Sequence, residues 1–295
     1  MITQDVLKTL AYFQALADMP LTLLEIKKYL IKEGSKNNTP LFDIQKSLNH
    51  LIKTRLVCGK NGFFYFENAR NNKVYINRIE KIKNTHGKWR KFNKINKFLM
   101  YIPYIRSISL TGSVALNNAS PKSDLDILIE SRKNRIWTVR LLTTAVSAIF
   151  LRRRYAKKIN NKLCFNRYMV ENSDLGPTNI NHVVKNRVIV WKKGYDTSGE
   201  TIYSLKPNIF GFAIKTLAEF ILNITAVGFF LEKVSGALQI KKIKHNLIES
   251  PRHITPLTIP ASNIFFYYPS VLETEKKCKD ILNSLYRFGH VENYY

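Results

Sequence analysis

Two aspartates one residue apart are the groups in this chain best placed to do chemistry. Asp124 and Asp126 lie in the run Ser-Asp-Leu-Asp-Ile-Leu-Ile, which is typical of a buried strand. Side chains alternate along a strand, so both carboxylates share one face. They repel each other there unless a cation lies between them. The pair therefore indicates a divalent metal held by hard oxygen ligands, with a phosphate as a further ligand.

A glycine–serine pair upstream supports the same interpretation. Gly112 and Ser113 are followed by ten residues and then by Asp124. Glycine lets backbone N–H groups come close to a phosphate, and serine offers it a hydroxyl. We therefore expect the two carboxylates to share one face at a sheet edge, beside the Gly112–Ser113 turn.

This pattern resembles the signature of the polymerase-beta-like nucleotidyltransferase superfamily, particularly its minimal members, over roughly residues 95–175. The resemblance implies a mixed sheet with helices, in which the glycine–serine pair and Ser123 bind the phosphates of a nucleotide. It implies that the two aspartates are catalytic and hold Mg²⁺ or Mn²⁺. The substrate would be an NTP such as ATP. The acceptor would be an RNA 3′ end, a protein or a small molecule.

The third carboxylate that such enzymes usually carry on a later strand is hard to place. The strand expected over residues 162–170 has no Asp or Glu in its interior. Asn166 is its nearest polar residue, Glu171 follows its end, and Asp174 lies in a stretch typical of a turn. An inactive relative, or a turn followed by a strand with solvent-facing aspartates, would also fit the motif.

Composition points to a globular protein with a polyanionic partner. The net charge of +26 favours RNA, DNA, nucleotides or an anionic membrane surface, although an AT-rich coding sequence would also enrich lysine. Cys58, Cys164 and Cys278 are widely spaced, which suggests neither disulfides nor zinc and suits a reducing cytoplasm. The first residues lack the pattern of a signal peptide, so we expect a cytoplasmic protein.

The first 68 residues resemble a winged helix-turn-helix domain. Three helical patterns are followed by a hairpin whose turn is Asn61-Gly62. In that fold the third helix, expected over residues 41–54, usually enters the DNA major groove. Its polar face would carry Gln45, Lys46, Asn49, His50 and Lys53. The alternative is a domain used only for packing or protein contact.

The sequence predicts an α+β protein of four parts. After the winged-helix domain come a basic connector helix over 69–100, the nucleotidyltransferase core over 101–180 and a helical C-terminal region over 181–295. By analogy, the C-terminal region would complete the acceptor side of the cleft. The sequence does not define the oligomeric state.

Two apolar helices are expected in the second half of the chain. Ile136–Leu151 is short for a membrane span and is interpreted as a core helix, with Arg135 and Arg140 near its start as candidate phosphate contacts. Ile209–Leu231 carries polar residues at four-residue spacing, which favours an amphipathic helix over a span. Peripheral membrane contact through both helices is the competing hypothesis.

Overall fold

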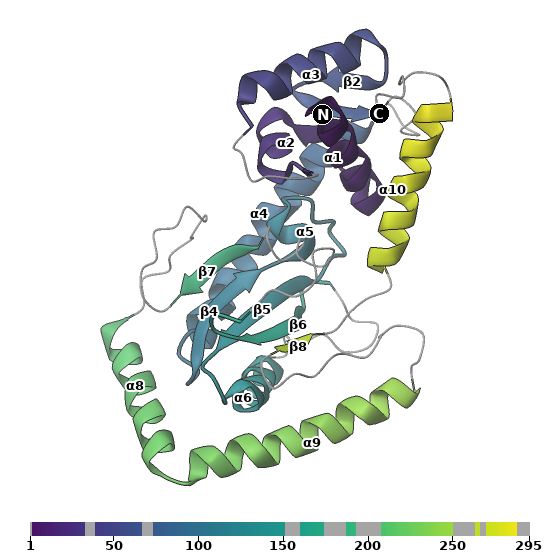
Figure 1. Cartoon of the computed structure of the whole chain (residues 1–295). Helices are drawn as coiled ribbons and strands as arrows, with labels where there is room; N and C mark the ends of the chain where they lie inside the picture. The colour runs from purple at the N-terminus through teal and green to yellow at the C-terminus, as the bar shows by residue number, and fades with distance from the viewer. Residues whose placement is uncertain are drawn as a thin grey trace. The chain divides into compact units, whose positions relative to one another are not determined.

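The computed structural model describes residues 2–32, 39–66, 73–150, 160–173, 187–192, 208–249, 263–265 and 270–287. Packing divides the chain into two compact units (Figure 1). The first comprises Met1–Ile82 and Ser270–Tyr295, and the second comprises Lys83–Pro269. Helix α4 (Val74–Leu99) begins in the first unit and ends in the second.

The first unit combines helices with a small antiparallel sheet. Its helices are α1 (Ile2–Ala17), α2 (Leu23–Tyr29), α3 (Leu41–Lys53) and α10 (Ser270–Arg287). Its strands are β1 (Leu21–Thr22), β2 (Val57–Lys60) and β3 (Phe63–Phe66), paired in the order β1-β3-β2. The apolar faces of α1, α2 and α3 form the core, with Val6, Leu10, Ile26, Ile44 and Leu48 almost fully buried.

Local sequence signals explain where these elements begin and turn. Thr22 caps α2, and Glu25 completes a capping box, because its carboxylate accepts the Thr22 backbone N–H at 2.9 Å. The β2–β3 hairpin turns at Asn61 and Gly62, whose φ angles of 51° and 79° are those of a tight primed turn. The predicted hairpin is therefore confirmed.

The second unit is built on a mixed sheet with the described strand order β7-β4-β5-β6-β8. The strands are β4 (Ile105–Leu110), β5 (Leu125–Ser131), β6 (Leu163–Val170), β7 (Val188–Lys192) and β8 (Asn263–Phe265). Strands β5 and β6 are parallel, and helix α6 (Ile136–Ile149) lies between them in the chain, whereas the other pairs are antiparallel. The predicted α+β class with a mixed sheet is confirmed, and this architecture is consistent with a nucleotidyltransferase fold.

Strands β7 and β8 come from the part of the chain expected to be helical. Both are short, and β7 is a nearly continuous buried run, Val-Ile-Val-Trp-Lys. Periodicity cannot distinguish such a run from a buried helical segment. Only the pairing of β7 with β4, and of β8 with β6, identifies them as strands.

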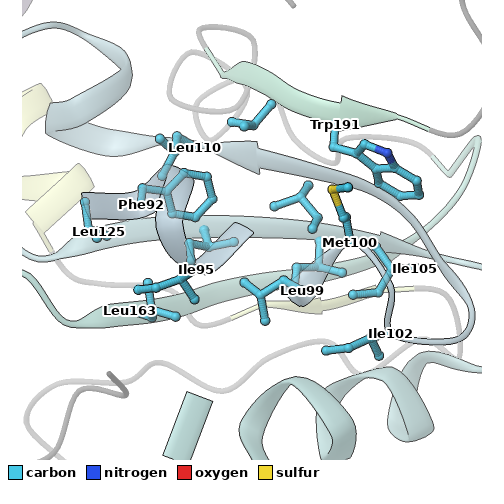
Figure 2. Close-up of a cluster of buried hydrophobic side chains, with 14 of the residues drawn as sticks. Phe92, Ile95, Leu99, Met100, Ile102, Ile105, Leu110, Leu125, Leu163 and Trp191 are labelled. Carbon is cyan, nitrogen blue, oxygen red and sulfur yellow. The ribbon is translucent and has the colours of Figure 1, made fainter. Parts of the chain in front are cut away.

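The core of this unit explains which face of β5 remains for chemistry. Leu125, Ile127 and Ile129 are fully buried and pack in the cluster that includes Phe92 and Leu99 of α4 (Figure 2). Side chains alternate along a strand, so the carboxylate of Asp126 lies on the opposite face. The expectation of a sheet edge was wrong in one respect, because β5 is the middle strand of the described sheet and the aspartates lie at its beginning.

The long apolar helix expected over residues 209–231 is two helices. Helix α8 (Ile209–Ile224) and helix α9 (Val227–Glu249) meet at an angle of 88°. The corner requires Gly228, because a Cβ there would collide with the carbonyl oxygen of Leu222. Hydrophobic periodicity did not predict this bend, because apolar residues continue on both sides of it.

Candidate active site

The turn after β4 brings a glycine against an aspartate of β5. The Thr111 N–H donates to the carbonyl oxygen of Asp126 at 2.9 Å, which extends the β4–β5 ladder into the turn. Gly112 then adopts a φ of +61°, a conformation that glycine reaches without strain. A Cβ on Gly112 would collide with Oδ2 of Asp126. The close approach of backbone and carboxylate therefore requires glycine.

Ser113 follows in the short helix α5 (Gly112–Ala115). Its carbonyl oxygen accepts the Asn118 N–H at 2.8 Å, which closes the turn that leads away from the site. Gly112 and Ser113 thus lie at the beginning of a compact turn, next to the Asp126 carboxylate. The structure brings together the glycine–serine pair and the Asp-x-Asp pair from the two ends of the sequence motif.

A cysteine completes a cluster of three candidate metal ligands. One carboxylate oxygen each of Asp124 and Asp126 and the Sγ of Cys164 all lie within 4.8 Å of one another. Cys164 reaches this position because β6 runs parallel to β5 and places it opposite Asp126. Cys164 is not among the ligands expected from the sequence, because wide cysteine spacing is a poor guide to pairing between distant strands.

The donor set of this cluster fits a divalent cation. Ligand atoms bound to one ion at roughly 2.0–2.3 Å are no more than about 4.5 Å apart, so the three groups are close to a coordinating arrangement. The two carboxylates suit Mg²⁺ or Mn²⁺, whereas a thiolate favours a softer ion. In the described part of the chain, no third carboxylate joins the pair.

The loop before Asp124 is held by a buried lysine of α4. The ammonium group of Lys88 donates to the carbonyl oxygens of Ser123 at 2.6 Å and Pro121 at 3.2 Å, and to Oδ1 of Asn161 at 3.2 Å. Burial and the nearby charge of Lys91 lower the pKa of Lys88, against an opposing contribution from Asp124. Lys88 therefore positions the aspartate loop, although the sequence showed it only as one of many basic residues.

Ser123 forms hydrogen bonds within this loop. Its hydroxyl accepts the Ser120 N–H at 3.0 Å and lies 3.0 Å from the Ser120 hydroxyl. Its carbonyl oxygen also accepts the Asn161 N–H at 3.1 Å. These contacts shape the turn that leads into Asp124.

Of the candidates for a third acidic or polar group, Glu171 lies away from the aspartate pair. Glu171 follows the opposite end of β6, about 20 Å along the strand from Cys164. There its carboxylate lies 3.8 Å from the Arg106 guanidinium. Asn166 is the extra residue where the β5–β6 register shifts. Asp174 lies outside the described residues.

The two arginines proposed to contact phosphate have side-chain partners in the C-terminal helices. Arg135 follows the far end of β5, where its guanidinium lies 5.1 Å from the centroid of the Tyr104 ring and donates to Asn223 at 3.3 Å. Arg140, on α6, donates to Gln239 of α9 at 2.8 Å. Both arginines thus connect α6 to the C-terminal helices.

A comparison with protein families supports the nucleotidyltransferase interpretation. Residues 89–190, about a third of the chain, match the family model of the nucleotidyltransferase domain. The matched segment contains the glycine–serine turn, both aspartates and Cys164. This match supports the polymerase-beta-like superfamily and nucleotidyl transfer in general. No curated protein and no solved structure significantly matches the chain.

Proposed function

We propose that the protein is a metal-dependent nucleotidyltransferase that moves a nucleoside monophosphate from an NTP to an acceptor hydroxyl. The acceptor oxygen would lose its proton and form a bond to the α-phosphorus of the NTP. The bond between the α-phosphorus and the oxygen that bridges the α- and β-phosphates would break, and pyrophosphate would leave. The observation that carries the proposal is the packing of the Gly112 backbone against Asp126, beside Asp124. This packing supports the proposal that the turn binds phosphate and that the aspartate pair binds metal in the same site.

Each residue of the site has a distinct role in this proposal. Gly112 and Ser113 bind the terminal phosphates through backbone N–H groups and a hydroxyl. Asp124 and Asp126 hold Mg²⁺ or Mn²⁺, with Cys164 as a third ligand in the place of a carboxylate. When bound, the cation would lower the pKa of the acceptor hydroxyl and stabilise charge on the phosphates. Lys88 keeps the loop of Asp124 in place.

Transfer of label from an NTP tests this function. The protein would be incubated with each α-labelled NTP and with Mg²⁺ or Mn²⁺, in the presence of total cellular RNA or protein. We expect label in an acceptor with the wild type and none with Asp126→Asn, which should fold normally because the half-buried carboxylate lies outside the core. Absence of transfer under all conditions, or equal transfer by Asp126→Asn, would contradict the proposal.

A second candidate function is a DNA- or RNA-binding regulator whose transferase domain is degenerate or senses a nucleotide. The distance of Glu171 from the aspartates favours it, because the described residues supply no third carboxylate. The first unit also has the order α1-β1-α2-α3-β2-β3 of a winged helix. On α3, Lys46, Asn49, His50 and Lys53 are exposed, so they are available to a nucleic acid.

A further inference from the structure

Helix α8 turns its polar residues inward and its apolar residues outward. Lys215 and Glu219 are only 2% and 6% exposed. Phe212 and Leu222 pack against the core, whereas seven other large apolar residues of the helix are each more than half exposed: Ile209, Phe210, Ile214, Leu217, Phe220, Ile221 and Ile224. A helix on the surface of a protein in water normally has the opposite arrangement.

Buried polar contacts fix α8 in this orientation. The Lys215 ammonium donates to the carbonyl oxygens of Met100 at 2.9 Å and Ile105 at 2.8 Å. The Glu219 carboxylate accepts a hydrogen bond from the Tyr104 N–H at 2.7 Å. It also accepts one from each terminal nitrogen of Arg106, both at 2.9 Å. Rotating the helix would take its charges away and leave the largely buried Arg106 guanidinium without its Glu219 partner, which is strongly unfavourable.

Helix α9 continues the same arrangement beyond the bend. Glu232 points to α6, where its carboxylate accepts the N–H groups of Trp137 at 3.0 Å and Thr138 at 2.8 Å. Gly236 lies against the Trp137 ring, so the two helices approach closely. The opposite side of α9 exposes Val227, Phe230, Val234 and Leu238, and Phe229 is also exposed near the start of the helix.

The exposed charged side chains near these apolar residues of α8 and α9 are all positive. Both carboxylates within residues 208–245 are turned inward, in contact with Arg106 and with the start of α6. The exposed charged side chains there are Lys233, Lys241, Lys242 and Lys244. Three of these lysines, Lys241, Lys242 and Lys244, lie within six residues after the exposed Leu238. A surface of this kind, apolar and then basic, complements a bilayer with anionic headgroups.

Helix length favours contact with one side of a membrane. No single helix among the described residues is long and apolar enough to cross a bilayer. Only α8 and α9 taken together have the length and composition of a span. Their 88° bend does not suit a straight span. Twelve exposed large apolar residues on two consecutive helices are unusual in a monomeric soluble protein and mark an interaction site.

We propose that α8 and α9 bind an anionic membrane surface. The apolar band over residues 209–238 inserts between headgroups and acyl chains, and the lysines of α9 contact lipid phosphates. The catalytic domain would thereby act at the membrane. This binding does not depend on nucleotidyl transfer, so a protein without transferase activity could still bind lipid.

Sedimentation with vesicles tests the proposal on the full chain. Phosphatidylcholine vesicles with and without phosphatidylglycerol would be compared for the wild type and the double variant Phe220→Ser, Phe230→Ser. Both phenylalanines are exposed, so the variant should fold, as circular dichroism would verify. We expect the wild type to bind anionic vesicles and the variant to bind them at least about tenfold more weakly. Phe42→Ser on α3 removes a phenylalanine that is even more exposed, and this variant should bind like the wild type.

A lysine variant tests the electrostatic part. Replacing Lys241, Lys242 and Lys244 by glutamine should weaken binding to anionic vesicles by roughly fivefold per lysine. The same replacement at the exposed Lys27, Lys28 and Lys73 of the first unit is the control. Failure of the wild type to bind, equal binding to neutral vesicles, or unchanged binding of the phenylalanine variant would overturn the proposal. A dimer that Phe220→Ser, Phe230→Ser dissociates, without lipid binding, would show that a second copy covers the band.

Discussion

The backbone of Gly112 lies against the carboxylate of Asp126, with no room for a methyl group between them. Gly112→Ala should therefore displace either the turn or the carboxylate, and it also strains a residue with positive φ. A displacement of about 1 Å can reduce a catalysed rate about 100-fold, so we expect a loss of that order in label transfer. The initial rate of transfer at saturating NTP is the measurement.

Gly87→Ala is the matched control for this substitution. Gly87 lies in α4 with open space around its Cβ position, so alanine should leave transfer unchanged and slightly stabilise the helix. Equal rates for Gly112→Ala and Gly87→Ala would show that the contact with Asp126 has no part in the reaction.

The position of Cys164 opposite Asp126 predicts a thiolate ligand in the metal site. Titration with Cd²⁺ or Co²⁺ should produce a thiolate-to-metal absorption band in the wild type and a much weaker band in Cys164→Ser. Cys58→Ser and Cys278→Ser should keep the band, because neither residue belongs to the cluster. Cys164→Asp should shift the preference toward Mg²⁺, since a carboxylate is a harder ligand. A band that persists in Cys164→Ser would exclude this ligand.

The exposed face of α3 predicts that Lys46 and Lys53 contact nucleic-acid phosphates. Their joint replacement by alanine should weaken binding and flatten its salt dependence, because each phosphate contact contributes about 0.9 to the logarithmic slope on duplex DNA. Titrations at several salt concentrations measure that slope, with Lys27→Ala, Lys28→Ala on α2 as the control. An unchanged slope would favour a packing or partner-docking role for this domain.

The ion pair of Glu219 with Arg106 predicts a dependence of stability on pH. Burial alone would raise the pKa of Glu219, but hydrogen bonds from Arg106 and the Tyr104 N–H, and the charges of Arg106 and Lys215, outweigh it and hold the pKa below its usual value. The resulting stabilisation is present above the unfolded pKa of about 4.3 and is lost as pH falls through the lower folded pKa.

Urea unfolding of the wild type and Glu219→Gln measures this effect. At pH 7 we expect the variant to lose roughly 3 kcal/mol of unfolding free energy, because Arg106 loses its charged partner in a largely buried site. Below about pH 4 the difference should narrow. A difference that stays constant from pH 7 to pH 3 would show that the Glu219 charge does not stabilise the folded state.

Short-range signals in the sequence were sufficient to predict much of the site and part of the fold. The turn at Gly112–Ser113, the carboxylates of Asp124 and Asp126 and the hairpin at Asn61 each depend on neighbours a few residues away. Turn chemistry and strand alternation act over that range, so they can be recognised in the sequence.

Tertiary structure decided the features that depend on distant partners. Cys164 reaches Asp126 only through the parallel pairing of β5 and β6, and Glu171 is taken away from the site by the direction of that strand. The polar stripe of α8 was visible in the sequence, but its inward direction depends on Arg106 and on carbonyl groups more than 100 residues away. Hydrophobic periodicity shows that a helix has two faces, whereas only packing decides which of them meets the protein.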